Sequence, residues 1–270
     1  MSLVVLMFHH VTPQKDVLSV TPEILEKLIV RFKQKGFHFI SYREFYDYLN
    51  KKNTLPKKSL MLTFDDGYYD NYQYGYEVLK KHNIPAVIFL ITSLIPGEKK
   101  RNLPFKSHHE LNKHPDKNYF LSLEEIKEMH SSGLIEFDSH THTHQNCVNL
   151  SKEEFEFQMC ESKNFIKSLI NRDFYGFCWP RGRFDDNALE AVKRCGYDFA
   201  FSTIEGPFSF KHDKFIIRRI DASSFRGDEK GYFKRLNKKI NIYSSFYGNI
   251  YSDLRLKLQK LKKRFKVLKR

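Results

Sequence analysis

Two short polar clusters have the residue types and spacing of a metal-dependent hydrolase. The first is Asp65-Asp66, which follows the apolar run 59–64 and precedes Gly67. Adjacent side chains at a strand end point in different directions, so one carboxylate can bind a metal while its neighbour faces water. Asp-Asp-Gly is also common in surface turns, but the apolar run before it favours a functional site.

The second cluster is the alternating segment 139–144, Ser-His-Thr-His-Thr-His. His140 and His144 share one face whether the segment is a strand or a helical turn. Two imidazoles at this spacing form a common zinc half-site. With one Asp they make three protein ligands and leave room for water, which is typical of catalytic zinc. The alternatives are a solvated polar turn and a single core histidine.

The elements that must position these clusters alternate between strand and helix patterns. Strand-like runs occupy residues 3–8, 59–64, 85–91, 134–138, 174–178, 197–202 and 215–220. Helix-capping patterns begin at Ser41, Ser122 and Ser151. The alternation predicts an α/β fold with a parallel sheet, open or closed into a barrel.

The polar clusters follow the ends of these strand-like runs, at residues 9–10, 65–66, 140–144 and 180–181. The carboxyl ends of parallel strands meet at one edge, where active sites form in such folds. Residues 97–118 lack periodicity and predict a long loop of the kind that often covers a site. We expect no catalytic role for its histidines, His108, His109 and His114.

Together these motifs resemble the polysaccharide deacetylases of carbohydrate esterase family 4, which share the NodB homology domain. The segment 177–186, Phe-Cys-Trp-Pro-Arg-Gly-Arg-Phe-Asp-Asp, is similar to the Pro-x-Gly segment of that family. Residues 6–11, Leu-Met-Phe-His-His-Val, resemble the N-terminal Tyr-His-x-Val of its poly-N-acetylglucosamine deacetylase branch. The resemblance spans about residues 1–222 and implies a distorted (β/α) barrel.

The resemblance also implies a role for individual residues. Asp65 corresponds to the general base, and the ligands of a divalent metal, usually zinc, correspond to Asp66, His140 and His144. The backbone N–H of Arg181 corresponds to a donor of the oxyanion hole.

The N-terminal motif implies that His9 is the catalytic acid and that His10 is its neighbour. His142 matches no ligand of the family.

The chain departs from the family at the third motif. Cys178 stands where many members have Arg, so the group that orients the base is open. Arg219 is a candidate, with a plain surface arginine as the alternative. Trp179 is expected either to stack on a sugar ring or to lie in the core. We include Trp179, Pro180 and Arg219 among the expected substrate-binding residues.

Charge divides the chain unevenly. The net charge is +14, from 46 Lys and Arg against 32 Asp and Glu; residues 230–270 carry 14 of those cations and one acid. Residues 1–229 are therefore nearly neutral and give no sign of nucleic-acid binding. We predict a catalytic domain at 1–229 and a basic amphipathic helical tail at 230–270.

An apolar stripe runs along the tail at Leu254, Leu258, Leu261, Phe265 and Leu268. Such a helix suits an anionic membrane surface or a partner helix. The alternative is a helix docked on its own domain.

The four cysteines have no metal-binding or framework spacing, and we expect them to be reduced. The N-terminus has no signal-peptide pattern. We therefore expect a cytoplasmic protein, peripheral on the membrane.

The predicted function is metal-dependent removal of N-acetyl groups from amino sugars. The expected substrate is a polysaccharide or a lipid-linked precursor of cell-envelope glycan. The alternatives are an O-deacetylase and a non-catalytic glycan-binding protein with a retained metal site.

Overall fold

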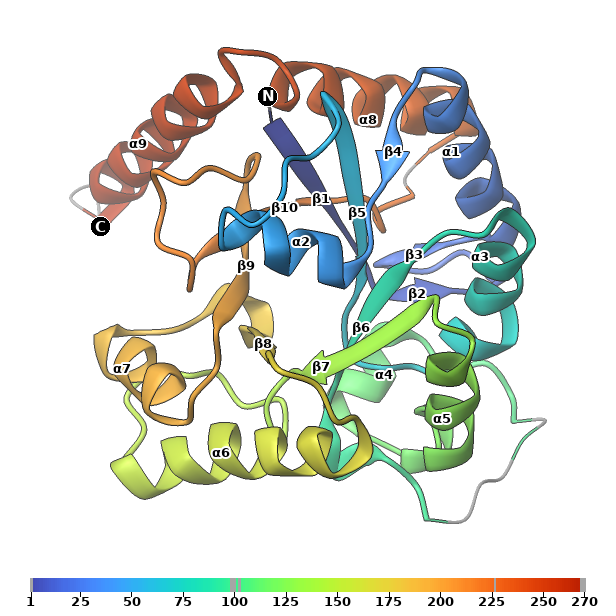
Figure 1. Cartoon of the computed structure of the whole chain (residues 1–270), viewed down its shortest axis with the longest axis vertical. Helices are drawn as coiled ribbons and strands as arrows, with labels where there is room; N and C mark the ends of the chain where they lie inside the picture. The colour runs from blue at the N-terminus through green and yellow to red at the C-terminus, as the bar shows by residue number, and fades with distance from the viewer. Residues whose placement is uncertain (1, 98–100, 102, 226, 268–270) are drawn as a thin grey trace.

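A closed parallel barrel forms the centre of the molecule (Figure 1). The computed structural model describes residues 2–97, 101, 103–225 and 227–267. Within them seven strands close a barrel in the order β1-β10-β9-β8-β7-β6-β5, because β5 also pairs with β1. The strands are β1 (Ser2–Phe8), β5 (Lys58–Phe64), β6 (Ala86–Leu90), β7 (Ile135–Ser139), β8 (Gly176–Cys178), β9 (Phe199–Glu205) and β10 (Ile217–Asp221). The predicted distorted (β/α) barrel is confirmed.

Short elements extend the barrel. The two-residue strand β4 (His38–Phe39) pairs with the start of β5, and β2 (His10–Val11) pairs with β3 (Ser19–Val20) beside the barrel. A π-helical turn, η1 (Asn71–Tyr76), leads directly into α3. The 3₁₀ turns are η2 (Thr92–Leu94), η3 (Lys117–Tyr119) and η4 (Pro180–Gly182).

Helices surround the strands, as Figure 1 shows for α1, α3, α5, α6, α7 and α8. The helices are α1 (Pro22–Gln34), α2 (Tyr42–Leu49), α3 (Glu77–His82), α4 (His108–Lys113), α5 (Leu123–Ser131), α6 (Lys152–Leu169), α7 (Asp186–Arg194), α8 (Glu229–Tyr243) and α9 (Gly248–Val267). Capping boxes open α2, α5 and α6 at the predicted serines. Tyr42 and Phe45 of α2 pack with side chains of the barrel interior.

The alternation of side chains along each strand decides what faces the barrel interior. Along β5, Leu60 and Leu62 pack in the outer core beneath the helices, whereas Met61 packs in the inner core with Phe89. The same alternation turns Asp65 toward the interior. Asp65 therefore lies above the apolar side chains that fill the barrel interior.

The predicted boundary between residues 229 and 230 is wrong. It falls inside the first turn of α8, and α8 buries a stripe of side chains in the main core: Tyr232, Phe233, Leu236, Ile240 and Tyr243. For α8 the alternative of a docked helix therefore holds.

The last described helix, α9, follows α8. One face is held where Arg218 donates to Ser252 at 2.8 Å and pairs with Asp253 at 2.7 Å. The described side chains of the predicted stripe are Leu254, Leu258 and Leu261, and all three are exposed. The side chain of Phe265, and all of Leu268, lie outside the described residues.

The expectation of four reduced cysteines is wrong for one pair. A disulfide joins Cys160 of α6 to Cys195, which follows α7. The two lie 35 residues apart in sequence and meet because α6 packs against α7, which spacing alone does not reveal. Disulfides are typical of oxidising compartments, so the cysteines no longer support a cytoplasmic location. Among the described helices, none combines the length and apolar character needed to cross a bilayer.

Candidate active site

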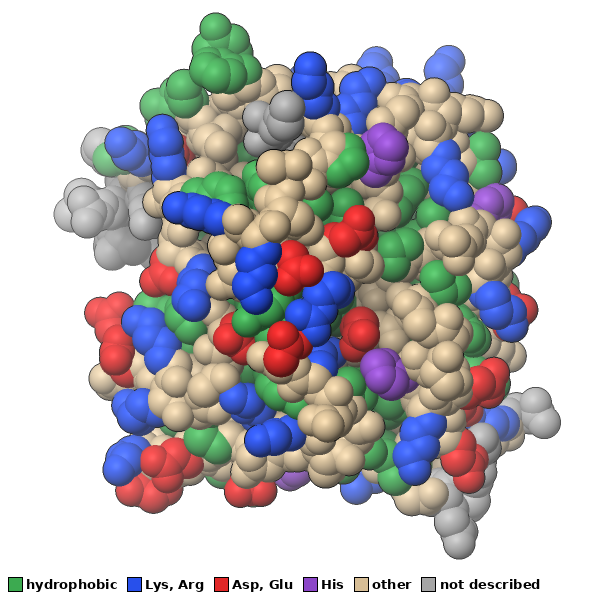
Figure 2. Space-filling model, in the orientation of Figure 1, with side chains coloured by type: hydrophobic (Ala, Val, Ile, Leu, Met, Phe, Trp, Pro, Cys, Tyr) green, Lys and Arg blue, Asp and Glu red, His purple; other side chains and the backbone are tan. Residues whose placement is uncertain are grey.

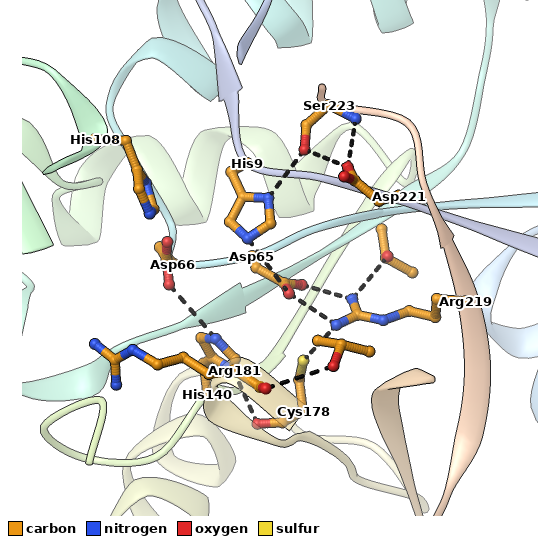
Figure 3. Close-up of polar contacts among 12 residues, drawn as sticks. His9, Asp65, Asp66, His108, His140, Cys178, Arg181, Arg219, Asp221 and Ser223 are labelled. Atoms are coloured by element: carbon orange, nitrogen blue, oxygen red, sulfur yellow. Dashed lines mark hydrogen bonds and ion pairs between the residues drawn. The ribbon is translucent and has the colours of Figure 1, made fainter. Parts of the chain in front are cut away.

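The predicted polar clusters meet at the carboxyl end of the barrel strands (Figure 3). His9 follows β1, Asp65 and Asp66 follow β5, His140 follows β7 and Arg181 follows β8. They come together because parallel strands deliver their carboxyl ends to one edge. The structure thus brings the predicted polar clusters together at this edge.

Left-handed backbone conformations gather at this edge. They occur at Asp66 (φ 74°), Thr141 (φ 68°), His144 (φ 61°) and Arg181 (φ 54°). Such strained residues persist where the surrounding structure fixes them, and they cluster at functional sites. Gly67 also has a positive φ of 75°, and a Cβ there would lie 2.6 Å from the Leu90 side chain. The turn after the paired aspartates therefore requires glycine.

Asp66, His140 and His144 form a site suited to a divalent cation. The Nε2 atoms of both histidines lie 3.4 Å from Oδ1 of Asp66. Both carboxylate oxygens of Asp66 are buried and have no hydrogen-bond partner among the described residues. A buried carboxylate without partners is costly unless a cation neutralises it. This orphaned carboxylate between two imidazoles fits a metal.

The two imidazoles are in the form that binds metals. Burial lowers the pKa of His140, and it lowers the pKa of His144 to about 3, so both rings are neutral. Nδ1 of His140 lies 2.8 Å from the Cys178 carbonyl oxygen, to which it donates. This bond leaves the Nε2 lone pair free to face Asp66.

A second group of metal-ligating types, Asp65, His140 and Cys178, lies beside the first. Arg219 occupies this group: it donates to Asp65 and, at 3.1 Å, to the Cys178 sulfur. Burial raises the pKa of the Cys178 thiol well above its usual value, so the thiol stays protonated. The guanidinium and the neutral thiol both disfavour a cation here.

Arg219 fixes the orientation of Asp65. It donates to the two carboxylate oxygens at 2.6 and 2.8 Å, and Thr63 and the Ser202 carbonyl accept its remaining bonds. Burial acts to raise the pKa of Asp65, but the charge and hydrogen bonds of Arg219 outweigh burial and lower it. The side chain of Arg219 is fully buried. The alternative of a surface arginine is therefore wrong, and so is the expectation that Arg219 binds the substrate.

His9 lies on the other side of Asp65. Its Nε2 is 4.0 Å from Oδ2 of Asp65, and its Nδ1 is 3.3 Å from the Ser223 hydroxyl. That hydroxyl donates to Asp221 at 2.8 Å. A chain of polar contacts thus aims Nε2 of His9 toward the base and the space above it.

Arg181 contacts the turn that carries His144. Its guanidinium donates to the His144 carbonyl at 3.0 Å and to Asn112 of α4 at 2.6 Å. The left-handed conformation of Arg181 interrupts the turn η4. The oxyanion-hole role of its N–H stays a prediction.

Comparisons with known proteins agree with this geometry. A sequence profile described as polysaccharide deacetylase matches residues 52–200, which is more than half of the chain. This chain belongs to the polysaccharide deacetylase family. The family consists of hydrolases, so the chain is assigned as a hydrolase.

Individual relatives of this deacetylase span most of the chain. The YxkH protein of Bacillus subtilis is 28% identical over 221 residues, 82% of this chain and 71% of its own. The poly-beta-1,6-N-acetyl-D-glucosamine N-deacetylase of Staphylococcus aureus is 29% identical over 210 residues, 75% of this chain and 67% of its own. The Streptococcus pyogenes deacetylase PplD, solved with acetate, shares the fold with a TM-score of 0.70 at 23% identity, covering 87% of this chain and 97% of that one.

Two expectations about the third motif of this deacetylase are corrected by burial. Trp179 is fully buried and donates from its indole nitrogen to the Phe215 carbonyl at 2.8 Å, so it is a core residue and offers no stacking face. Pro180 is also buried.

His142 turns away from the metal ligands, with its Nδ1 3.0 Å from the Thr92 hydroxyl.

His108 also lies at the site, although it was not among the predicted site residues. The predicted loop contains the short helix α4, opened by a capping box between Ser107 and Glu110. His108 lies edge-on to His9 with ring centroids 5.6 Å apart, and its Nδ1 is 3.2 Å from the Tyr68 hydroxyl. Burial lowers the pKa of His108 to about 4. His108 therefore lies beside His9, and the Ser-x-x-Glu pattern signalled the helix that carries it. The expectation that His108 has no catalytic role stays a prediction.

Proposed function

We propose that this chain is a metal-dependent N-deacetylase that releases acetate from N-acetylated amino sugars of a polysaccharide or a lipid-linked glycan precursor. The observation that carries the proposal is the unpartnered buried carboxylate of Asp66 beside two neutral imidazoles, with the ionised Asp65 next to it. The name of the Staphylococcus aureus relative supports the N-acetylated amino sugar as substrate.

Zinc is the proposed cation. Ligands about 2.0–2.1 Å from a tetrahedral zinc lie roughly 3.3–3.4 Å apart, and both imidazole nitrogens lie 3.4 Å from Asp66. One carboxylate and two imidazoles leave a coordination position open, as in catalytic zinc sites. When bound, the cation supplies a Lewis acid for the acetamide carbonyl and for the attacking water.

Asp65 accepts the proton of the attacking water. Because Arg219 keeps the carboxylate ionised, Asp65 is ready to act as a base at neutral pH. The water oxygen adds to the carbonyl carbon, and negative charge develops on the carbonyl oxygen. The backbone N–H of Arg181 is the proposed donor to that oxygen.

His9 donates a proton to the leaving nitrogen, and the proton that Asp65 took from the water replaces the one that His9 loses. Ser223 and Asp221 hold its Nδ1, so Nε2 is the atom that delivers the proton. The C–N bond then breaks, and the products are acetate and a free amine on the sugar. An amine leaves poorly unless it is protonated, so the reaction depends on this histidine.

Acetate release from N-acetylglucosamine oligosaccharides, with and without a chelator, tests the proposal. We expect release that stops when the metal is removed and returns with zinc. Release from O-acetylated sugars alone would establish the O-deacetylase. Glycan binding without release from either substrate would establish the non-catalytic glycan-binding protein.

The proposed partner of α9 is an anionic membrane. Its outward face and the turn before it expose large apolar side chains, with exposed fractions between 46% and 85%: Phe246, Tyr247, Ile250, Tyr251, Leu254, Leu258 and Leu261. Figure 2 shows hydrophobic side chains projecting at the top, over the α8–α9 turn. The surrounding segment 230–270 carries 14 cations against one acid, and each cation near an anionic surface contributes about 1 kcal/mol.

Co-sedimentation with vesicles of phosphatidylglycerol and phosphatidylcholine tests this partner. The full chain should bind the anionic vesicles and not pure phosphatidylcholine. High salt screens the charges, so the vesicle binding that remains at high salt depends on apolar side chains. Replacing Phe246 and Ile250 with serine should weaken this remaining binding. Equal binding of wild type and variant in high salt would contradict the assignment.

A further inference from the structure

The turn after β7 holds a conformation that its own residues do not favour. Thr141 and His144, neither of them glycine, have positive φ angles of 68° and 61°. Such conformations persist where the surrounding structure imposes them. The barrel strands hold His140, because its N–H donates to the Leu90 carbonyl at 2.8 Å and its Nδ1 to the Cys178 carbonyl. His144 lies further along the turn, so its position depends on what holds residues 141–145.

Gln158 of α6 holds this part of the turn. Its side chain is buried, with 2% exposed, although glutamine is mostly found on protein surfaces. Its side-chain oxygen accepts from the N–H of Thr143 at 2.9 Å. Its side-chain nitrogen donates to the Thr143 hydroxyl at 2.7 Å and to Gln145 at 3.2 Å. The two residues that flank His144 in the sequence are therefore bonded to one buried side chain.

The backbone of Gln158 adds a further bond to the turn. Its carbonyl accepts from the N–H of His142 at 2.9 Å. These bonds go to residues 142, 143 and 145 and not to the rings of the two histidine ligands. Gln158 can thus orient His144 through the turn, without contact with a cation.

The helix that carries Gln158 is itself fixed. Phe155 and Met159 of α6 are buried in the main core. Two residues after Gln158, Cys160 forms the disulfide with Cys195 and so joins α6 to the end of α7. A side chain positions a ligand precisely only when its own backbone is rigid. The helix α6 meets this condition.

Resting on the proposed metal site, we infer that Gln158 is a positioning residue that fixes His144 and thereby raises the affinity of the site for its cation. Mutation of groups that orient metal ligands typically lowers metal affinity about 10–100-fold. Loss of the Gln158 hydrogen bonds should therefore weaken zinc binding while the barrel stays folded.

The Kd for zinc, measured on the full chain by competition with a chromophoric chelator, tests the inference. Gln158→Met keeps the length of the side chain and removes its hydrogen bonds, so the Kd should rise about 10–100-fold. Gln158→Glu retains an acceptor for the Thr143 N–H. Because hydroxyl and amide partners can reorient their donors, its Kd should stay within about threefold of the wild type. The matched control is Glu156→Met, an exposed position of the same helix, which should bind zinc as the wild type does.

The melting temperature with and without zinc separates positioning from general stability. A merely structural glutamine would lower both melting temperatures alike and leave the Kd for zinc unchanged. A positioning glutamine also makes the zinc-induced rise in melting temperature smaller in Gln158→Met. If Gln158→Met does not fold, Thr143→Val provides the test, because Thr143 is exposed. This change removes one bond to Gln158 and should raise the Kd about threefold.

An unchanged Kd for zinc in the folded variants, or an equal rise in Glu156→Met, overturns the inference and leaves the proposed deacetylase intact. A wild type that binds no zinc would refute the metal site and the inference with it.

Discussion

Replacing Arg219 with methionine removes the cation that keeps the base ionised. Arg219 donates charge-assisted hydrogen bonds of 2.6 and 2.8 Å to Asp65. Each such bond contributes about 1.5–3 kcal/mol, so the ionised carboxylate loses roughly 3–6 kcal/mol of stabilisation. Loss of this stabilisation raises the pKa of Asp65.

Asp65 can accept a proton only when its carboxylate is ionised, and this requirement fixes the direction of the pH dependence. Burial, which acts to raise the pKa of Asp65, is unopposed in the variant, and the base is protonated at low pH. Activity of Arg219→Met should therefore fall as the pH is lowered from about 8 to about 6, where wild-type Asp65 stays ionised.

Folding stability follows the same linkage. In the wild type the lowered pKa of Asp65 contributes stability above the unfolded-state pKa of about 3.9, and this stability is lost as the pH falls through the folded-state pKa. In the variant the folded-state pKa is raised, so the variant is destabilised at neutral pH and recovers as Asp65 takes up its proton.

The assay is kcat/KM for acetate release between about pH 5 and 9, with bound metal measured in parallel. We expect the activity of Arg219→Met to fall more steeply than that of the wild type between about pH 8.5 and about pH 6. The matched control is Arg218→Met, because Arg218 lies on the same strand but contacts Ser252 and Asp253 of α9. A pH profile of Arg219→Met that matches the wild type, with metal bound, would refute the role given to Arg219.

Three further outcomes follow from the site. His140→Ala or His144→Ala should lose the metal measured by elemental analysis, whereas His142→Ala should retain it because its ring faces Thr92; loss from His142→Ala alone would contradict the ligand assignment. His9→Ala should slow amide hydrolysis by about 10²–10⁴ and an activated aryl acetate much less; equal losses would indicate a structural role. Denatured, unreduced protein should contain two reactive thiols, because two of the four cysteines form a disulfide; four thiols would refute the pairing.

The cluster of Asp66, His140 and His144 was predictable because its members lie in two short segments of the sequence. Asp65 and Asp66 are adjacent, and His140 and His144 lie within one turn after the strand that ends at Ser139. Arg219 was predicted as a candidate partner of Asp65, but the sequence did not decide between this role and a plain surface arginine. Arg219 reaches Asp65 from a strand 154 positions away, and its inward orientation depends on the register of β10 in the barrel. The burial of Trp179 depends in the same way on packing between distant elements.

For the outer helices α8 and α4, the prediction failed for a different reason. The apolar positions of α8 recur at helical spacing, at Tyr232, Leu236, Ile240 and Tyr243, so its docking face was present in the sequence. The high positive charge of residues 230–270 obscured that face, because net charge describes a segment and packing depends on one side of it. The Ser107–Glu110 capping box was likewise present within a segment that lacks longer periodicity.

The proposal of a metal-dependent deacetylase with Asp65 as its base is tested most directly by acetate release from an N-acetylglucosamine oligosaccharide. The proteins to compare are the zinc-loaded wild type and Asp65→Asn. The substitution keeps the size of the side chain and removes the proton acceptor, while the metal ligands stay intact. We expect release by the wild type, a loss of about 10²–10⁴ in kcat for Asp65→Asn, and equal bound metal in both proteins. Near-normal turnover by Asp65→Asn with its metal bound would show that Asp65 is not the base.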